Sequence, residues 1–407
     1  MQFLYSFSIQ IYYVALLLAS PFVPKAKAWI VGRRNWKKQL PTFESSNVVW
    51  FHCASLGEFD QGLPLMNLLK EKDPTVFLVV TFFSPSGMEH YHKRQHKVDF
   101  AMYLPIDSKS NAKNFIQHFQ PTKIFFVKYE FWHFYIQQAN VFSIPVYSVS
   151  TLLRQQQIYF KSYGGFFRNI LKNIDYFFVQ NQKTGDLLKS IGILNFEIVG
   201  DTRFDRVLEN SLQANENTTI EQFLKEEKAL IYGSSWPEDE ALFIPFVKKS
   251  RDQKFIIAPH DISESHIKNI ENQLGDKAIR YSQFENTFGG NVLILDTIGH
   301  LASAYKYGAI AYVGGGFSGK LHNILEPAVF GLPVIFGPKY SRFPEAALFI
   351  EKGIGFSIAD AQSFENQVSW IKKNGTALKE KAVQVVNDNK GSSEKIFTFL
   401  KRSKFAN

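Results

Sequence analysis

Short apolar runs alternate with helix-length amphipathic segments along most of the chain. In the first half, runs rich in Val, Ile and Phe predict strands over residues 48–54, 76–83, 101–105, 123–129, 144–150, 176–179 and 197–199. Each run is followed by a segment long enough for a helix. This alternation is typical of a doubly wound parallel sheet whose two faces are both covered by helices.

The same alternation restarts after a polar stretch. Residues 208–228 are predicted as a linker because Asn, Glu and Thr residues gather near their centre. Beyond it, apolar runs predict strands over residues 229–232, 254–258, 292–295, 309–313 and 333–336. The tail predicts two basic amphipathic helices, and residues 391–407 are expected to pack on the first domain. The sequence therefore predicts domains over residues 39–207 and 229–390.

The N-terminus has the composition of a membrane anchor. Residues 1–24 carry no charged side chain, and their length is close to the roughly 20 residues that a spanning helix needs. Six cations follow before the first acidic residue, Glu44: Lys25, Lys27, Arg33, Arg34, Lys37 and Lys38. By the positive-inside rule, this pattern predicts an anchor over residues 1–38 with the domains on the cytoplasmic side.

Two rival interpretations of the N-terminus differ in strength. A cleaved signal peptide carries its charges before the apolar region, so the cations that follow it here argue against cleavage. A helix that lies in the membrane interface stays open, because polar side chains recur in the first half of the segment. They are Ser6, Ser8, Gln10, Tyr12 and Tyr13.

Charge and cysteine content narrow the class of protein. The net charge is +9, and most of it comes from the cations at residues 25–38. Such a local excess indicates a membrane-surface patch and not a nucleic-acid-binding face. Cys53 is the one cysteine, which excludes a disulfide framework and a cysteine-based metal site.

Polar residues gather where the predicted strands of the first domain end, and ligands of parallel sheets bind at those ends. Glu58 follows the first strand and a turn formed by Ser55 and Gly57. It is either an acid that stabilises a helix N-terminus or a general base. Ser84 and Ser86 follow the second strand, in a turn suited to hydroxyl or phosphate contacts.

Two further strand ends carry charged residues. Lys128 and Glu130 lie at the end of the fourth strand and form either a local ion pair or part of a site. Arg154 follows the fifth strand, and with Lys161 and Arg168 it makes a candidate anion-binding patch. These ends place acidic and basic groups on the edge of the sheet where an acceptor would bind.

The second domain contains a glycine-rich stretch between two predicted strands. Three glycines at residues 314–316 allow close approach of a backbone to a ligand. Asn323 is predicted as the N-cap of a short helix, with Glu326 in its first turn and Gly331 at its end. The loop and helix N-terminus suit a phosphate, and the carboxylate suits a ribose diol. An ordinary strand–helix–strand unit with a tight glycine turn fits the pattern equally well.

Two such domains predict the GT-B glycosyltransferase architecture, in which two Rossmann-like domains face a central cleft. One domain would hold a nucleotide and the other an acceptor. A metal is generally dispensable in this class, because helix N-termini and basic side chains stabilise the leaving phosphate. No Asp-x-Asp motif lies at a predicted strand end, so we expect no metal and no cofactor.

Several motifs, in the same order, resemble the 3-deoxy-D-manno-octulosonic acid (Kdo) transferase family. The resemblance runs from the anchor to about residue 355. It is carried by Ala54-Ser-Leu-Gly-Glu58, Gln180-Asn181, Gly200-Asp-Thr-Arg-Phe-Asp205, Asp296-Thr-Ile-Gly299 and His322-Asn-Ile-Leu-Glu-Pro327. The last motif is the most specific, because a glutamate followed by Gly-x-Pro-Val alone would fit many GT-B enzymes.

The resemblance implies an inverting enzyme of the inner membrane, facing the cytoplasm, that moves Kdo from CMP-Kdo to the lipid A precursor (lipid IVA) in lipopolysaccharide core synthesis. It implies Glu58 as general base, with Glu130 and Arg203 supporting the transition state. The residues implied for the CMP-Kdo donor are Pro259, His260, Gly299, His300, Leu301, Gly315, Gly316, His322, Asn323, Ile324, Leu325 and Glu326. Those implied for the acceptor are Ser55, Gly57, Ser84, Ser86 and Arg154.

The chain departs from the family pattern at four places. His260 and Asp261 stand after Pro259 where Arg and His are usual, so a donor-contacting arginine is missing or supplied elsewhere. His300 replaces a glutamate, Lys128 replaces the first acid of a Glu-x-Glu pair, and Arg203 replaces a lysine. Two alternatives therefore stay open: a GT-B enzyme for another sugar nucleotide, including an epimerase, or a membrane-tethered nucleotide-sugar-binding protein with a degenerate site.

Overall fold

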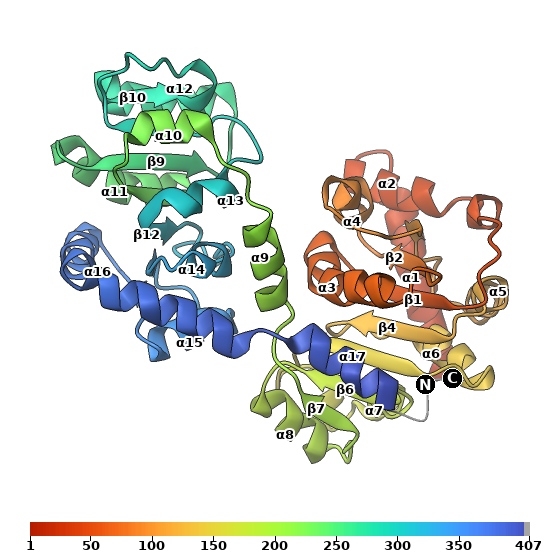
Figure 1. The fold of residues 1–407 in the computed structure, drawn as a ribbon. Coiled ribbons are helices and arrows are strands. Elements are labelled where there is room, and N and C mark those ends of the chain that lie inside the picture. The colour runs from red at the N-terminus through yellow and green to blue at the C-terminus, as the bar shows by residue number, and fades with distance from the viewer. Residues whose placement is uncertain (403–407) are drawn as a thin grey trace. The chain divides into compact units, whose positions relative to one another are not determined.

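The computed structural model describes residues 1–402 and divides into two compact units, both coloured by residue number in Figure 1. Unit 1 comprises residues 1–206 and the described part of the segment that begins at Lys390. Unit 2 comprises residues 207–389. Each unit is built on a seven-stranded parallel sheet, which confirms the predicted α/β class.

The sheet of unit 1 has the order β3-β2-β1-β4-β5-β6-β7. Its strands are β1 (Val48–Cys53), β2 (Phe77–Phe82), β3 (Phe100–Tyr103), β4 (Lys123–Val127), β5 (Val146–Thr151), β6 (Tyr176–Val179) and β7 (Phe196–Ile198). All pairs are parallel, so every carboxyl end lies on one edge. The strand order reverses at β1, where open α/β sheets form their ligand crevice.

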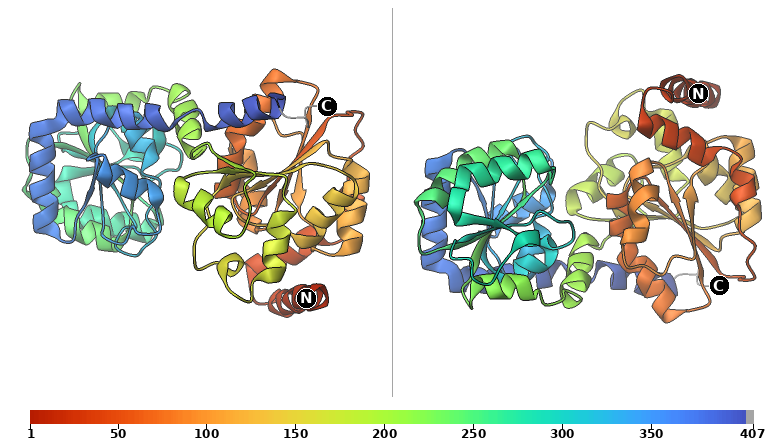
Figure 2. Two further views of the ribbon diagram at one scale, coloured as in Figure 1. Left: turned by 90° about the horizontal axis from the view of Figure 1, so that it is seen from below. Right: turned by 90° about the horizontal axis from the view of Figure 1, so that it is seen from above.

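Helices cover both faces of this sheet (Figure 2). They are α1 (Gln2–Ala19), α2 (Pro24–Arg33), α3 (Leu56–Lys72), α4 (Pro85–His90), α5 (Lys109–Phe119), α6 (His133–Val141), α7 (Gly165–Lys172), α8 (Gln182–Ser190) and α17 (Ser392–Arg402). Trp50 belongs to one hydrophobic cluster, and Phe51 belongs to the cluster on the other face. Consecutive side chains of a strand point to opposite faces, which is why β1 is apolar throughout.

The sheet of unit 2 has the order β10-β11-β9-β8-β12-β13-β14. Its strands are β8 (Ala229–Ser235), β9 (Lys254–Pro259), β10 (Ala278–Arg280), β11 (Val292–Ile294), β12 (Gly308–Val313), β13 (Val334–Phe336) and β14 (Gly355–Ser357). Its helices are α10 (Thr218–Leu224), α11 (Pro237–Lys249), α12 (Glu264–Leu274), α13 (Leu301–Ala304), α14 (Leu325–Val329), α15 (Pro344–Glu351) and α16 (Ala361–Asn389). The helix α9 (Arg203–Leu212) runs across the boundary between the units.

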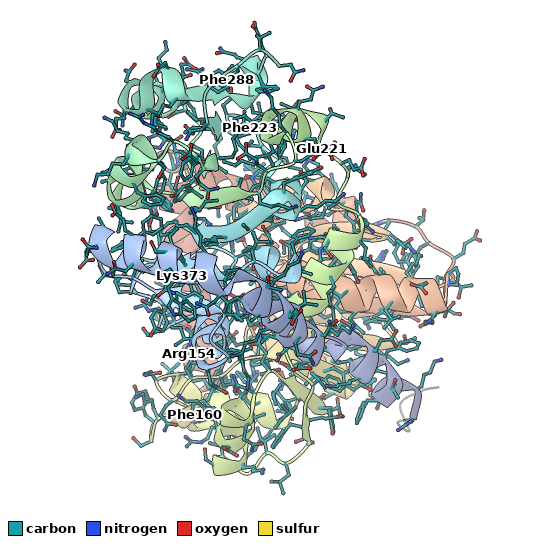
Figure 3. All side chains as sticks on the ribbon, turned by 60° about the vertical axis from the view of Figure 1, so that its left-hand side comes forward. Arg154, Phe160, Glu221, Phe223, Phe288 and Lys373 are labelled. Atoms are coloured by element: carbon teal, nitrogen blue, oxygen red, sulfur yellow. The ribbon has the colours of Figure 1, made fainter. Side chains whose placement is uncertain are left out.

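The segment predicted as a linker contains α10 and the second half of α9. Ile220, Phe223 and Leu224 of α10 share one face at helical spacing and are buried in unit 2. On the other side of α10, Glu221 accepts a hydrogen bond from the Tyr307 hydroxyl at 2.9 Å. Figure 3 labels Glu221 and Phe223 on this helix. The sequence analysis did not predict α10, because the polar residues at its exposed positions resemble those of a linker.

The C-terminal helix α17 is part of unit 1. Its Ile396 and Leu400 lie in the same hydrophobic cluster as residues of α3. Asp205 holds the start of α17, because its carboxylate accepts hydrogen bonds from the backbone N–H groups of Gly391 at 2.5 Å and Ser393 at 2.8 Å. The aspartate that ends the Gly-x-x-Arg-Phe-Asp motif therefore caps a helix that begins 187 positions later in the chain.

We expect Asp205→Ala to loosen α17, since two backbone donors at the helix start would lose their acceptor. A lost cap of this kind costs about 1–2 kcal/mol, which corresponds to roughly 5–30-fold faster local opening. Hydrogen exchange of the α17 amides measures this change. Asp186→Ala is the matched control, because the Asp186 carboxylate on α8 accepts only from the exposed Gln182 amide. Unchanged exchange in α17 would contradict the capping role.

Candidate functional site

Glu58 lies in the first turn of α3, directly after β1, and its side chain is buried. Its Oε2 accepts a hydrogen bond from the Ala54 backbone N–H at 2.5 Å. Burial, and next the negative charge of Glu130, raise the pKa of Glu58 to about 7, while Lys128 and the N–H groups of Ala54 and Ser55 oppose the rise. A carboxyl group with this pKa can accept or release a proton near neutral pH.

A buried chain of polar side chains lies beside Glu58 at the end of β1. The Trp132 indole N–H donates to His52 Nε2 at 2.9 Å, so this nitrogen is an acceptor and carries no proton. His52 is therefore neutral with its proton on Nδ1, which donates to Thr81 Oγ1 at 2.9 Å. Burial lowers the pKa of His52, which favours the same neutral form.

Glu130 meets this chain without bonding to it. Glu130 Oε2 lies 3.8 Å from His52 Nε2, and this nitrogen has no proton to donate. Among residues 1–402, Glu130 Oε2 finds no hydrogen-bond partner. Lys128 has a left-handed backbone with φ of 73°, a conformation that costs energy outside glycine. The strained turn after β4 thus brings Lys128 and Glu130 into the electrostatic surroundings of Glu58.

Gln180 and Thr202, which belong to the family motifs, support the irregular end of β5 at Ser150. Ser150 has a left-handed backbone with φ of 51°, and its hydroxyl lies 2.5 Å from Thr202 Oγ1. Thr202 donates to the carbonyl of Gln61 on α3 at 2.6 Å. Gln180 Nε2 donates to the carbonyl of Ser150 at 3.2 Å. These contacts join the ends of β5 and β6 to α3, which carries Glu58.

The other predicted site residues of unit 1 do not contact the buried polar chain around His52. Arg203 forms an ion pair with Asp201 at 2.6 Å. Arg154, labelled in Figure 3, is exposed, and the expected partner in its patch, Arg168, donates to backbone carbonyls instead. The hydroxyls of Ser84 and Ser86 lie 2.9 Å apart.

The residues that open α3 complete this edge. Ser55 precedes the helix and is half-buried, whereas Gly57 in its first turn is exposed. Within residues 1–402, no side chain and no backbone from another element lies within 4 Å of the point where a Cβ of Gly57 would stand. The start of α3 therefore combines open space at Gly57 with the buried carboxyl group of Glu58.

The glycine-rich loop of unit 2 is held by Asp239 of α11, which is buried. One oxygen of Asp239 accepts from the backbone N–H groups of Trp236 and Gly315, both at 2.9 Å. The other accepts from the Tyr312 hydroxyl at 2.6 Å. Three donors thus compensate the buried carboxylate, which ties the loop after β12 to the start of α11. The sequence analysis missed Asp239.

The three glycines of this loop are required for a different reason from the one expected. A Cβ on Gly314 would collide with the carbonyl of Ser234, one on Gly315 with the carbonyl of Lys320, and one on Gly316 with the backbone of Gly337. Gly315 also has a φ of +85°. The Cβ directions are therefore filled by the chain itself, so close packing between its own turns explains these glycines without a ligand.

His260 and His322 stack with Trp236 beside this loop. The rings of His260 and Trp236 are 4.3 Å apart, and those of His260 and His322 are 4.7 Å apart. Burial and the charge of His260 lower the pKa of His322 to about 4, so His322 is neutral and its Nε2 lies 3.2 Å from the Trp236 indole nitrogen. The Lys320 ammonium lies 5.2 Å from the centre of the Trp236 ring. The sequence places Trp236 at a strand end without assigning it a role, and it gives no sign of Lys320.

Asn323 and Glu326 meet at the start of α14. Asn323 Nδ2 donates to Glu326 Oε1 at 3.1 Å, and Asn323 Oδ1 accepts from the Leu325 N–H at 3.1 Å. The predicted N-cap was wrong by one position, since Ile324 precedes the helix and Asn323 binds the first helical N–H from outside. Ile324 and Leu325 are buried, so they support this turn from within unit 2.

The remaining donor candidates lie at two neighbouring strand ends. Pro259 ends β9 and is buried. Gly299 has a φ of +102° with open space around its Cβ direction, and Leu301 begins α13. The His300 ring lies 4.2 Å from the Tyr281 ring, and its Nδ1 lies 3.4 Å from the Asn217 amide nitrogen. His300 is thus engaged by protein side chains.

Within residues 1–402, no group of three His, Cys, Asp or Glu side chains is arranged to hold a metal ion.

We expect Asp239→Asn to destabilise unit 2. All three partners of Asp239 are donors, so an amide NH₂ in place of one oxygen would face a donor and leave it unsatisfied. The expected loss is about 1–3 kcal/mol, measured as a lower thermal midpoint and faster hydrogen exchange at residues 314–316. Glu238→Gln, at the neighbouring exposed position of α11, is the control. Equal behaviour of the two variants would contradict this account of the loop.

The family model and the sequence relatives that match this chain carry the same enzyme name. Residues 32–206 match the family model described as 3-Deoxy-D-manno-octulosonic-acid transferase (kdotransferase). The chain is 23% identical over 396 residues to 3-deoxy-D-manno-octulosonic acid transferase of Rickettsia prowazekii, covering 90% of this chain and 82% of that one. The enzyme of the same name from Aquifex aeolicus is 28% identical over 316 residues, covering 76% and 82%.

Solved structures confirm the fold. UDP-GlcNAc 2-epimerase from Neisseria meningitidis matches with a TM-score of 0.64 at 17% identity, covering 88% of this chain and all of that one. Acinetobacter baumannii MurG matches with a TM-score of 0.55 at 11% identity and the same coverage. These are enzymes of the GT-B fold, and identities this low speak for the fold alone. The relatives found by sequence indicate that the chain is a glycosyltransferase, similar along most of its length to 3-deoxy-D-manno-octulosonic acid transferases.

Proposed function

We propose that this glycosyltransferase moves Kdo from CMP-Kdo to the lipid A precursor, lipid IVA, with inversion at the anomeric carbon. The observation that carries the proposal is the Glu58 carboxyl group, which is buried at a strand end and has a pKa of about 7. Lipopolysaccharide core synthesis is the process that this reaction would serve.

Glu58 would act as the general base. Its carboxylate takes the proton of the acceptor sugar hydroxyl while the hydroxyl oxygen attacks the anomeric carbon of Kdo. The bond from that carbon to the CMP phosphate oxygen breaks, and its electron pair leaves with CMP. Because the attack comes from the face opposite CMP, the configuration inverts. A well-placed base contributes typically about 10²–10⁴-fold to the rate.

Neighbouring charges would support the transition state. Glu130 raises the pKa of Glu58, and so makes its carboxylate a stronger base. Lys128 acts in the opposite direction on the same group. Arg203, held by Asp201, provides the positive charge for the developing anion. A guanidinium presents donors in a fixed fork, so its geometry differs from that of the usual lysine.

The donor would bind at the strand ends of unit 2. Glu326, oriented by Asn323, would accept hydrogen bonds from the ribose hydroxyls. His322, Ile324, Leu325, the loop at Gly315 and Gly316, and the turn of Gly299, His300 and Leu301 would enclose CMP. Lys320 is our candidate for the charge of the missing arginine, because it lies over Trp236, which stacks on His260 after Pro259. No metal ion is required in this scheme, since the cation is a side chain.

The acceptor would bind at the strand ends of unit 1. Ser84, Ser86 and Arg154 offer hydroxyl groups and a cation to the phosphorylated glucosamines, while Ser55 and Gly57 form the turn beside the base.

The helix α1 is long and apolar enough to cross a membrane by length and composition. It supports association with the inner membrane, with both units on the cytoplasmic side.

We expect Glu58→Gln to lower kcat by about 10²–10⁴-fold and to leave the affinity for CMP-Kdo within twofold. Since only the carboxylate form accepts a proton, kcat/KM of the wild type should rise with pH up to about 7 and then level off. Glu130→Gln removes a negative charge, so the pKa of Glu58 falls and the rise moves to lower pH. Transfer to lipid IVA, followed by mass spectrometry, measures both effects. A near-normal kcat of Glu58→Gln would show that Glu58 only stabilises the start of α3 and is not the base.

We expect CMP to raise the thermal midpoint of the protein more than UDP at equal concentration, because the stabilisation by a ligand increases with the logarithm of its affinity. Lys320→Ala should remove most of the stabilisation by CMP if the ammonium contacts its phosphate. Lys248→Ala, an exposed cation on α11, is the control and should leave the shift unchanged. A larger shift with UDP would instead favour an enzyme for a UDP-sugar.

A further inference from the structure

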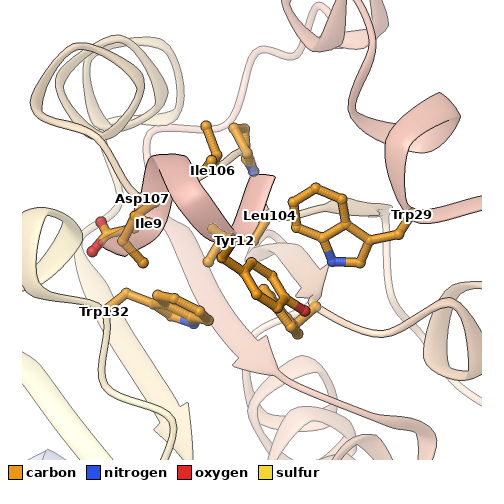
Figure 4. A pocket seen from close by; sticks show the side chains of 9 residues that line it. Ile9, Tyr12, Trp29, Leu104, Ile106, Asp107 and Trp132 are labelled. Carbon is orange, nitrogen blue, oxygen red and sulfur yellow. The ribbon is translucent and has the colours of Figure 1, made fainter. Parts of the chain in front are cut away.

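Trp132, which precedes α6, is held in one orientation by close packing. Phe83 stacks on its ring at 5.0 Å, and Ile9 and Tyr12 line a narrow apolar pocket together with it (Figure 4). The free volume of this pocket is about 10 Å³, room for at most about one water molecule. The indole therefore cannot turn without displacing its neighbours, and its N–H stays directed at His52 Nε2, 2.9 Å away.

Thr81 fixes the other side of the His52 imidazole. Its Oγ1 accepts from the Trp50 indole N–H at 2.8 Å and lies 2.9 Å from His52 Nδ1. Thr81 and His52 are both 0% exposed, so bulk water reaches neither of them. Because the lone pair of Nε2 is taken by the Trp132 N–H, the proton of the neutral imidazole has to lie on Nδ1. Two buried indole groups thus determine which nitrogen of His52 carries the proton.

The position of this proton decides whether His52 can donate to Glu130. Glu130 Oε2 lies 3.8 Å from His52 Nε2 and has no hydrogen-bond partner among residues 1–402. A shift of about 1 Å would bring the two atoms within hydrogen-bond distance, if Nε2 carried a proton. Trp132 prevents this bond by occupying Nε2. Its N–H therefore acts on Glu130 without touching it.

The charge of Glu130 matters because of its effect on Glu58. Burial raises the pKa of Glu58, and the charge of Glu130 adds to the rise, whereas Lys128 opposes it. Lys128 stands where the family pattern has an acid, so of these two positions Glu130 alone supplies negative charge here. A hydrogen bond from His52 would compensate part of that charge. The protonation site of His52 thus bears on how strong a base Glu58 is.

We infer that Trp132 and His52 are positioning residues that keep a hydrogen-bond donor away from Glu130, so that the full charge of Glu130 acts on Glu58. This inference rests on the proposed function for the role of Glu58 as the base. Neither Trp132 nor His52 exchanges a proton with the substrate, and both act through Glu130.

Other titratable groups face these residues from the elements packed around them. They are Tyr12 of α1, Arg33 of α2, Cys53 of β1, Lys128 and Tyr129 after β4, and Tyr159. Burial raises the pKa of the three tyrosines and of Cys53, so these groups stay uncharged around neutral pH. Burial lowers the pKa of Arg33 to about 9, which leaves its guanidinium charged there. The change of charge near pH 7 therefore belongs to Glu58.

Trp132→Phe tests the inference, because it removes the indole N–H and keeps an aromatic ring in the pocket. The imidazole can then carry its proton on Nε2 and donate to Glu130, while Nδ1 accepts from the Thr81 hydroxyl. With part of the Glu130 charge compensated, the pKa of Glu58 falls and the rise of kcat/KM moves to lower pH. The ratio of kcat/KM at pH 6 to its plateau value should increase about two- to threefold, which corresponds to a pKa lower by roughly 0.3–0.5. An unchanged or smaller ratio would overturn the inference.

Trp50→Phe is the matched control. It removes the other buried indole N–H, whose acceptor is Thr81, and leaves the bond from Trp132 to His52 in place. The ratio should stay at the wild-type value. An equal shift in Trp50→Phe would assign the effect to a general loosening of the sheet edge, and the inference would fail.

A double variant, Trp132→Phe with Glu130→Gln, tests the route through Glu130. If Trp132 acts through the charge of Glu130, the double variant should have the same pH profile as Glu130→Gln alone. Additive shifts would show that Trp132 reaches Glu58 by another route, which contradicts the inference.

Magnetic resonance reads the same arrangement without any transfer reaction. In the wild type, the nitrogen-15 shifts of His52 should show a protonated Nδ1 and an unprotonated Nε2. A proton on Nε2 would overturn the inference even if Trp132→Phe fails to fold. The carboxyl carbon-13 signal of Glu58 should titrate near pH 7, and at lower pH in Trp132→Phe. If this signal shifts while kcat/KM does not follow, only the role of Glu58 as base, and with it the proposed mechanism, is wrong.

Discussion

Carboxylates that accept hydrogen bonds from backbone N–H groups hold loops and helix ends of both units in place. Asp239 has three donors, and these fix the glycine-rich loop against α11. Asp205 has two, which fix α17 on unit 1. Glu58 also accepts from backbone, but the charge of Glu130 and its own burial act against its ionised form. Asp239 and Asp205 thus hold local structure in place, whereas Glu58 has a pKa near 7 and can exchange a proton at neutral pH.

The sequence predicted the features that depend on local pattern. Burial of Trp50 and Phe51 on opposite faces of the sheet follows from the two-residue repeat of a strand, and the position of Glu58 follows from the turn before a helix. The contacts that position the candidate site depend on residues far apart in the chain. Asp205 caps α17, and Asp239 reaches Gly315 across 76 positions. No periodicity or spacing in a single sequence indicates such pairs.

For the glycines at residues 314–316, the sequence predicted a close approach correctly but not the groups that approach. Three consecutive glycines after a strand indicate close approach of a backbone, and the structure has such an approach. The approaching groups are carbonyl and backbone atoms of Ser234, Lys320 and Gly337. The nucleotide-binding proposal for unit 2 therefore depends more on the side chains around the loop than on the glycines. Trp236, Lys320 and Glu326 supply a ring, a cation and a carboxylate there.

Docking of α1 on unit 1 changes what the N-terminal helix contributes to the enzyme. A helix joined by a flexible tether would leave the distance between α1 and Glu58 variable. The bond from Tyr5 to Asp107 and the rings around Tyr12 instead fix α1 against the unit that carries Glu58. Arg33, buried at the end of α2, adds to this by donating to the carbonyls of Leu104 and Phe83, which follow β3 and β2. Reaction rates depend steeply on how a base and a hydroxyl are positioned. Under the proposed function, a helix fixed in this way would favour transfer to an acceptor held in a bilayer.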